Sequence, residues 1–306
     1  MKSGVRTRYI VSQSSAGNRA IQKMSKQIGE GNEGRKSADG VIATTYQVPY
    51  ADSGQVDLLV EERGEGQPFL LLHGGAGPVT MARFAGLMAG RHPTRVITPT
   101  HPGFARTKRP DALKSVRGLA QVYAAFLDRI GVSDVTVIGN SVGGWIAAEL
   151  ALLANPRITG VVLVGATGIE VPGHPIPDTS KLTLDEIMSL SYHNPIPFRV
   201  DPARMTDDQR AIMASNRAAL SVYAPQTTDP TLAQRLGRIA IPMLVISGDS
   251  DRIVDAGYGR AYAAAIPGAK FELLAGTGHL PQIETPELLL ETVWSFRHAG
   301  RQAKSV

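Results

Sequence analysis

The sequence contains no cysteine, which excludes disulfide bonds, zinc–thiolate sites and a cysteine nucleophile. This absence leaves the cellular compartment open, because a cysteine-free chain is compatible with reducing and oxidising surroundings. No apolar run approaches the roughly 18–20 residues that span a bilayer, so we expect no membrane-spanning helix. The first 29 residues hold no acidic residue and no apolar stretch of the length that is typical of a secretory signal.

The positive charge of the chain is concentrated at its start. The formal net charge is +5, and residues 1–40 carry eight basic against three acidic residues, which leaves 24 of each sign in the rest. Because the rest of the chain has equal numbers of basic and acidic residues, it has no excess of positive charge that would favour binding to nucleic acid or to an anionic membrane. We expect residues 1–40 to form a flexible basic extension that is dispensable for activity, and we expect the protein to be cytoplasmic. The basic, serine-containing start leaves organellar targeting open as the alternative.

The 306 residues suffice for one large α/β domain with an insertion. Apolar runs typical of buried strands alternate with helix-like segments, so we predict a doubly wound, mostly parallel sheet with helices on both faces. Residues 42–48 and 56–61 are predicted to open the sheet as an antiparallel pair. The other predicted strands are residues 69–72, 95–98, 135–138, 158–164, 242–246 and 271–274; the predicted helices are residues 80–89, 111–130 with Asp111 as the N-cap, 146–153, 257–265 and 285–296.

Residues 169–236 differ from their surroundings because they open with prolines and lack strand-like runs. Helix-like stretches at residues 184–190 and 207–224 predict a helical cap inserted over the ligand-binding end of the sheet. The core is then formed by residues 41–168 and 237–298, followed by a tail over residues 299–306. Ligands of such sheets bind at the carboxyl ends of the parallel strands.

One stretch, V-T-V-I-G-N-S-V-G-G-W over residues 135–145, combines a predicted strand, a G-x-S-x-G turn and a predicted helix. A serine on such a strained turn projects its hydroxyl above the sheet, and the flanking glycines leave room for the backbone. The backbone N–H of Val142 and the positive end of the helix can face a developing oxyanion. The alternative is a glycine-rich turn in which Ser141 is an ordinary helix cap.

Acyl-transfer hydrolysis needs a serine, a histidine base and a carboxylate that fixes the tautomer of the histidine. In doubly wound hydrolases these residues follow one another as serine, acid and histidine. Ser141, Asp251 and His279 occur in this order, each just after a predicted strand. Asp249 and Asp255 are alternatives for the acid, and either of them could instead cap the following helix.

Four motifs together resemble the α/β-hydrolase fold superfamily over residues 41–298. They are L-L-H-G-G from residue 71, G-N-S-V-G-G from residue 139, G-D-S-D from residue 248, and G-H-L-P-Q-I-E-T-P from residue 278. The resemblance implies Ser141 as nucleophile, His279 as base and Asp251 as acid. It also implies the backbone N–H groups of Gly75 and Val142 as oxyanion donors.

We therefore predict a serine hydrolase that needs neither a cofactor nor a metal and cleaves a small carboxylic ester or related acyl substrate. A serine at the turn argues against epoxide hydrolases and haloalkane dehalogenases, which need a carboxylate nucleophile. Asn140 before the serine resembles enzymes that hydrolyse carbon–carbon bonds of vinylogous diketone ring-fission products, and this activity is one alternative. Those enzymes usually have tryptophan where this chain has Leu280, and Thr100 and Ala105 also depart from common motifs. A non-catalytic ligand receptor on the same fold is the second alternative.

The remaining candidate residues are expected to have structural or solvated positions. His73 is predicted to organise the oxyanion loop through backbone hydrogen bonds. The other loop histidines, His101, His174 and His193, are predicted to be solvated. Cap packing is predicted for Met188, Met205, Met213, Tyr192, Phe198 and Tyr223, with the lining of an apolar pocket as the alternative. A solvated helix face is predicted for Arg199, Arg204, Arg210 and Arg217, with binding of a substrate carboxylate as the alternative. The partner is a small molecule, and the sequence leaves a monomer and a homodimer open.

Overall fold

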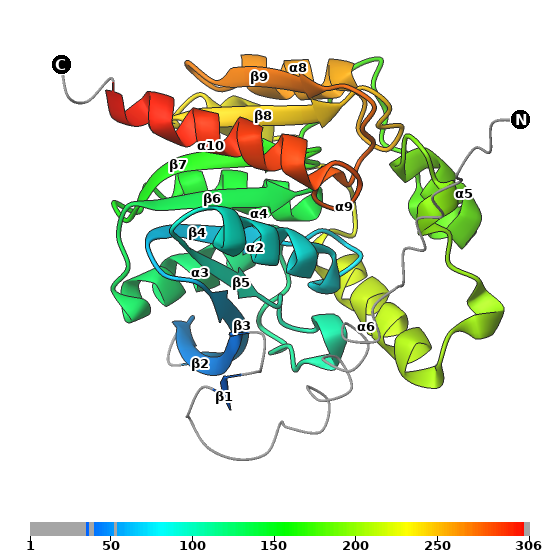
Figure 1. Ribbon diagram of the computed structural model, residues 1–306, viewed down its shortest axis with the longest axis horizontal. Coiled ribbons are helices and arrows are strands. Elements are labelled where there is room, and N and C mark those ends of the chain that lie inside the picture. The colour runs from blue at the N-terminus through cyan, green and yellow to red at the C-terminus, as the bar shows by residue number, and fades with distance from the viewer. Residues whose placement is uncertain (1–34, 37–39, 52–53, 303–306) are drawn as a thin grey trace, which may run out of the picture. The chain divides into compact units, whose positions relative to one another are not determined.

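The apolar runs of the sequence form a nine-stranded sheet in the computed structural model (Figure 1). The structure describes residues 35–36, 40–51 and 54–302, so most of the predicted extension and the last four residues of the tail lie outside the described residues. The strands are β1 (Arg35–Lys36), β2 (Ile42–Tyr50), β3 (Gly54–Arg63), β4 (Gln67–Leu72), β5 (Thr94–Pro99), β6 (Val135–Asn140), β7 (Ile158–Val164), β8 (Met243–Gly248) and β9 (Lys270–Leu274).

The spatial order of the strands is β1-β2-β3-β5-β4-β6-β7-β8-β9. The first three strands are antiparallel to their neighbours, whereas β5, β4, β6, β7, β8 and β9 are parallel. This confirms the predicted antiparallel opening and the mostly parallel sheet. The loops that follow β4, β6 and β8 therefore lie at the same edge of the sheet, where ligands of such folds bind.

Helices cover both faces of the sheet because successive side chains of each central strand point to opposite faces. In β4, Phe69 and Leu71 belong to the core cluster that includes residues of α2 and α10, whereas Leu70 and Leu72 belong to the cluster that includes residues of α3, α4 and α8. The α-helices are α2 (Val79–Arg91), α3 (Val116–Ile130), α4 (Val142–Leu152), α5 (Leu184–Ser191), α6 (Asp207–Tyr223), α7 (Leu232–Leu236), α8 (Ala256–Ala264), α9 (Pro281–Glu284) and α10 (Pro286–Gln302), and the 3₁₀ helices are η1 (Phe104–Arg106), η2 (Thr179–Lys181), η3 (Ile196–Phe198) and η4 (Pro202–Arg204).

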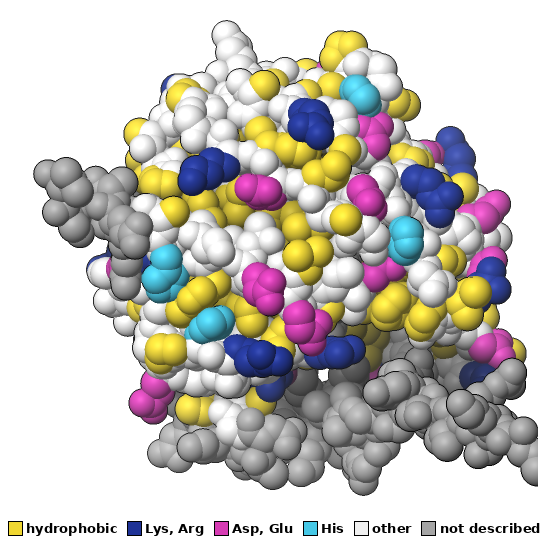
Figure 2. Space-filling view, turned by 45° about the horizontal axis from the view of Figure 1, so that its top comes forward, with side chains coloured by type: hydrophobic (Ala, Val, Ile, Leu, Met, Phe, Trp, Pro, Cys, Tyr) yellow, Lys and Arg dark blue, Asp and Glu magenta, His cyan; other side chains and the backbone are white. Residues whose placement is uncertain are grey.

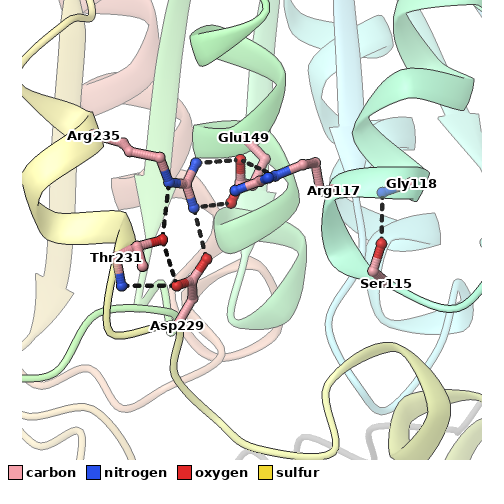
Figure 3. Close-up of polar contacts among 7 residues, drawn as sticks. All are labelled: Ser115, Arg117, Gly118, Glu149, Asp229, Thr231 and Arg235. Atoms are coloured by element: carbon pink, nitrogen blue, oxygen red, sulfur yellow. Dashed lines mark hydrogen bonds and ion pairs between the residues drawn. The ribbon is translucent and has the colours of Figure 1, made fainter.

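The start of α3 differs from the prediction, which placed Asp111 at its N-cap. Ser115 is the N-cap, because its extended backbone places Oγ 3.0 Å from the N–H of Gly118 (Figure 3). The residues before it form a separate turn in which the N–H of Leu113 donates to the carbonyl of Pro110 over 3.0 Å.

The helical segment, residues 169–236, contains α5, α6 and α7 and no strand, and all of its residues are described. Figure 1 shows α5 and α6 beside the end of the sheet to which the parallel strands point. The chain leaves and returns at one place, because Gly168 pairs with Thr228 and its carbonyl accepts the N–H of Asp229 over 2.7 Å. The segment thus has both ends fixed at the sheet edge.

A buried ion pair ties α7 to α4 (Figure 3). The carboxylate of Glu149, 4% exposed, accepts two hydrogen bonds from Arg235 at 2.6 and 2.7 Å, and Arg235 also contacts Asp229 at 2.7 Å. A buried carboxylate that loses its partner typically costs about 3–5 kcal/mol of stability. The return of the chain from the helical segment is therefore fixed to the helix that starts at the G-x-S-x-G turn.

Candidate active site

Ser141 lies on a strained turn between β6 and α4. Its φ of 57° and ψ of −122° are rare for a residue with a side chain and cost roughly 1–3 kcal/mol. The turn is tight because a Cβ on Gly139 would lie 2.1 Å from the carbonyl oxygen of Gly143, and one on Gly143 would lie 2.2 Å from that of Leu72. Ser141 holds the N-cap position of α4, but its side chain makes no cap hydrogen bond, so it differs from an ordinary capping serine.

His279 and Asp251 form a buried pair in the loops after β9 and β8. The Nδ1 atom of His279 lies 2.8 Å from Oδ2 of Asp251, whose Oδ1 accepts the N–H groups of Ile253 and Val254 at 2.8 and 2.9 Å. An ionised carboxylate only accepts hydrogen bonds, so this contact favours the tautomer of a neutral His279 in which Nδ1 carries the hydrogen and Nε2 has the lone pair. Gly165 lies against the pair, since a Cβ there would approach Nδ1 to 3.0 Å.

Asn140 joins the turn of Ser141 to the loop of His279. Its buried side chain donates to the carbonyls of His279 and Val164 at 2.9 and 3.1 Å and accepts from Nε2 of Gln282 at 3.0 Å. The amide group of Asn140 is therefore engaged inside the protein. The sequence motif G-H-L-P-Q-I-E-T-P contains Gln282, but no role is predicted for this residue from the sequence.

The structure brings the serine close to the pair without a hydrogen bond between them. Ser141 follows Asn140, which binds the backbone of His279, and no hydrogen bond joins the hydroxyl of Ser141 to His279 among the described residues. Such contacts are often loose in unliganded enzymes and tighten when substrate binds.

The two alternative acids serve other purposes. Asp249 accepts the N–H groups of Gly276 and Thr277 at 2.9 and 3.2 Å and so holds the loop after β9. Asp255 is the N-cap of α8 and accepts the N–H of Tyr258 at 2.9 Å, as the cap alternative predicted for it. Both carboxylates are thus engaged by backbone N–H groups.

The loop after β4, residues 73–78, is held by His73. This fully buried side chain contacts the carbonyl of Gly74 through Nδ1 at 2.8 Å, and the same carbonyl accepts the N–H of Gly77 at 3.1 Å. The predicted role of His73 in backbone hydrogen bonding is thereby confirmed. The loop lies against the serine, because a Cβ on Gly74 would lie 3.1 Å from Cβ of Ser141. Gly75, the expected oxyanion donor, follows directly.

His101 is buried, so its predicted solvated position is wrong. Its ring stacks on that of His73 with centroids 3.7 Å apart, its backbone N–H donates to Nε2 of His73 at 3.1 Å, and its Nε2 lies 2.9 Å from the carbonyl oxygen of His73. Its Nδ1 contacts the hydroxyl of Tyr123. Two of the residues that contact it, His73 in the loop after β4 and Tyr123 in α3, are far away in the sequence. His174 and His193 are partly or fully exposed, as predicted, and contact Asp255 and Ser250.

The buried histidines make stability sensitive to acid. Burial lowers the pKa of His101 to about 4, and burial together with the nearby His101 lowers that of His73. Between pH 6.5 and about 4 the unfolded chain binds a proton at His101 that the folded chain excludes, so stability is full above this window and falls through it as the pH is lowered. The loss from His101 alone amounts to about 3 kcal/mol at pH 4.

Urea unfolding of wild type and His101→Gln at several pH values checks this prediction. We expect the variant, in which glutamine retains a donor and an acceptor, to lose less stability than wild type between pH 6.5 and 4. His298→Gln, at an exposed position, should keep the wild-type slope. Equal acid slopes for wild type and His101→Gln would contradict the assignment.

The side chains of the helical segment follow the prediction with two exceptions. Tyr192 is buried and its ring stacks on that of Phe198 at 4.5 Å, whereas the buried Tyr223 belongs to the main core cluster and donates to the carbonyl of Pro102 at 2.8 Å, outside the segment. Met188 and Met205 are half-buried, but Met213 is 39% exposed, so its predicted packing is wrong. The predicted solvated arginines are all exposed: Arg199, Arg204, Arg210 and Arg217.

The surface and the described side chains add three observations. On the face drawn in Figure 2, side chains of both charges lie interspersed. Among the described residues, no group of three or more His, Asp or Glu side chains is arranged to hold a metal ion. Within the same residues, every helix is too short or too polar to cross a bilayer.

Comparison with known sequences gives a family and two relatives. The sequence model described as "Alpha/beta hydrolase family" matches residues 69–292. The chain is 29% identical over 266 residues to the "Putative carbamate hydrolase RutD" of Azorhizobium caulinodans, covering 81% of this chain and 98% of the relative. It is 27% identical over 251 residues to the 2-hydroxymuconate semialdehyde hydrolase of Pseudomonas putida, covering 78% and 89%.

A solved structure has the same fold. The thermophilic esterase from Thermogutta terrifontis superposes with a TM-score of 0.69 at 20% identity, covering 84% of this chain and 99% of the esterase chain.

Proposed function

Because this chain belongs to the alpha/beta hydrolase family, we propose that it is a serine hydrolase that cleaves small carboxylic esters or related acyl substrates through an acyl-enzyme on Ser141. The observation that carries the proposal is the buried pair of His279 and Asp251 in the loops beside the strained turn of Ser141. A family hydrolase with this pair has the base and the acid that a serine nucleophile needs.

In the proposed reaction, Oγ of Ser141 attacks the carbonyl carbon of the ester while Nε2 of His279 takes the serine proton. The Asp251 carboxylate, 2.8 Å from Nδ1, stabilises the imidazolium that forms. The imidazolium then gives its proton to the departing alcohol, which leaves the acyl-enzyme. Water, deprotonated by His279, attacks the acyl-enzyme; the imidazolium then returns its proton to Oγ of Ser141 as the acid is released.

We assign the oxyanion hole to the N–H groups of Gly75 and Val142. Val142 is the first residue of α4, and such an N–H has no acceptor within its own helix. The positive end of α4 favours negative charge at the same place. Each such donor typically contributes about 10²- to 10³-fold to kcat.

The helical segment is proposed to cover the acyl group of the substrate. Leu220 of α6 packs over the loop after β4, since a Cβ on Gly75 would lie 2.9 Å from Cδ2 of Leu220. An apolar side chain at this position favours an uncharged acyl group near the oxyanion donors.

Carbon–carbon bond hydrolysis is the second candidate, because the chain is similar to the 2-hydroxymuconate semialdehyde hydrolase. The residue that suggested this activity, Asn140, binds the backbone of His279 and Val164 and the side chain of Gln282. Its presence is explained by these contacts without reference to a substrate. Ester hydrolysis is therefore placed first.

A substrate panel with the full chain tests the proposal. We expect a fluorophosphonate probe to label Ser141, and short p-nitrophenyl esters to give a burst of p-nitrophenol as the acyl-enzyme forms. A ring-fission dienoate that turns over with a higher kcat/KM than every ester would favour the second candidate. Labelling of Ser141 without turnover of any substrate would favour a receptor, and an unlabelled Ser141 would overturn the proposal.

A further inference from the structure

Asn216 of α6 bridges two loops at the candidate site. This residue is 4% exposed; its Nδ2 donates to the carbonyl of Ala76 at 3.0 Å, and its Oδ1 accepts the N–H of Ala105 at 2.8 Å. The amide can satisfy both contacts in one orientation, because one partner only accepts and the other only donates. The contact with the loop after β4 is close, since a Cβ on Gly77 would lie 2.5 Å from Nδ2.

The hydrogen bond to Ala76 influences the orientation of the N–H of Gly75 through two peptide planes. The carbonyl of Ala76 and the N–H of Gly77 belong to one planar peptide, so a donor on the carbonyl fixes the direction of the N–H. That N–H donates to the carbonyl of Gly74 at 3.1 Å. The Gly74 carbonyl in turn shares a peptide plane with the N–H of Gly75, and a trans peptide directs the two groups oppositely.

The second loop that Asn216 holds is strained. Ala105 and Arg106 have φ values of 48° and 64°, a left-handed conformation that non-glycine residues rarely adopt. Ala105 thus occupies a position at which a glycine would be unstrained. The N–H groups of both residues bind side chains of α6, Ala105 to Asn216 and Arg106 to Oγ of Ser215 at 3.0 Å.

We propose that Asn216 is a positioning residue for the reaction, which holds the N–H of Gly75 in the direction that binds the oxyanion. The inference rests on the proposed function and extends it, because it makes α6 part of the support of the oxyanion hole. Asn216 acts through the loop after β4, and its contribution is made in the transition state, where the oxyanion forms. Loss of this support should therefore lower kcat and leave KM largely unchanged.

Ser215 offers a matched control on the adjacent position. Its hydroxyl holds the same strained loop through Arg106 but does not contact the loop after β4. Asn216→Ala removes both contacts, whereas Asn216→Asp keeps an acceptor for Ala105 and loses the donor to Ala76. The isosteric aspartate is the second variant if the alanine variant does not fold.

The experiment measures kcat, KM and the affinity for an alkylboronic acid, which forms a tetrahedral adduct with a serine and places an oxygen where the oxyanion develops. We expect Asn216→Ala and Asn216→Asp to lower kcat by about 10- to 100-fold, as misplacement of a catalytic group by about 1 Å does, with KM within about threefold of wild type. Boronate affinity should fall in parallel. Ser215→Ala should stay within about threefold of wild type in each measurement.

Three outcomes would overturn the inference in an active enzyme: an unchanged kcat in both Asn216 variants, a loss confined to KM, or an equal loss in Ser215→Ala. A wild-type chain that neither turns over esters nor reacts with the fluorophosphonate would overturn the proposed function itself, and this inference with it. Failure of the two proposals can thus be told apart from the wild-type measurement.

Discussion

Replacing Ser141 by alanine is expected to abolish ester hydrolysis, with a fall in kcat of roughly 10⁵- to 10⁶-fold. The alanine variant keeps the buried His279–Asp251 pair and the N–H groups of the turn but has no atom that can form the acyl-enzyme. Any remaining rate comes from substrate binding and the oxyanion donors, which still act on attack by water. Initial rates on p-nitrophenyl esters and loss of fluorophosphonate labelling check the expectation. Retention of more than about one hundredth of the wild-type kcat would remove Ser141 from the nucleophile role.

The backbone of Ser141 allows a sharper version of this experiment. Because φ is 57°, the backbone at residue 141 is held in a conformation that glycine adopts without strain. Ser141→Gly should be as inactive as the alanine variant, yet its free energy of unfolding should exceed that of the alanine variant by about 1 kcal/mol. Urea unfolding at neutral pH measures the difference. An alanine variant that is as stable as the glycine variant would show that the turn carries little strain.

The sheet and its main helices could be predicted because their residues are buried on one or both faces. The apolar runs that became β4, β6, β7 and β8 sit between two layers of helices, so their composition reports burial directly. The alternation of strands and helices then fixes which loops lie at the carboxyl edge. For this reason the loops of Ser141, Asp251 and His279 could be placed together from the order of elements alone.

The hydrogen-bond partners at the site could not be predicted, because they come from distant segments. His101 is buried by the ring of His73, from the loop after β4, and by the ring of Tyr123, from α3, and a single histidine in a turn-rich stretch carries no mark of these contacts. Asn216 is one polar residue in an otherwise ordinary helix, and its importance is visible only when α6 lies on two loops. The prediction of where α3 begins was wrong for a different reason. Asp111 and Ser115 are both good N-cap residue types, and only the backbone conformation shows which of them caps the helix.

The assignment of the acid rests on a comparison between two aspartates of the same loop. Asp251→Asn is expected to lower kcat by about 10⁴-fold, because an amide N–H₂ facing Nδ1 favours the tautomer in which Nε2 carries the hydrogen and cannot act as base. The neutral side chain also removes the charge that balances the imidazolium. Its N–H contacts with Ile253 and Val254 can persist through the amide oxygen, so the loop should remain folded.

Asp249→Asn is the matched control, because Asp249 lies two residues earlier and binds the N–H groups of Gly276 and Thr277 instead of the imidazole. An amide oxygen can keep one of these contacts, so we expect kcat within about tenfold of wild type and a loss of stability of about 1 kcal/mol. The decisive measurement is kcat for both variants across pH 6 to 9. A larger loss of kcat in Asp249→Asn than in Asp251→Asn would assign the acid role to Asp249. The buried contact of 2.8 Å between Asp251 and His279 would then have only a structural role. The expected ranking instead requires that the carboxylate in contact with Nδ1 sets the tautomer of His279, which is the property that turns a loop histidine into a base for Ser141.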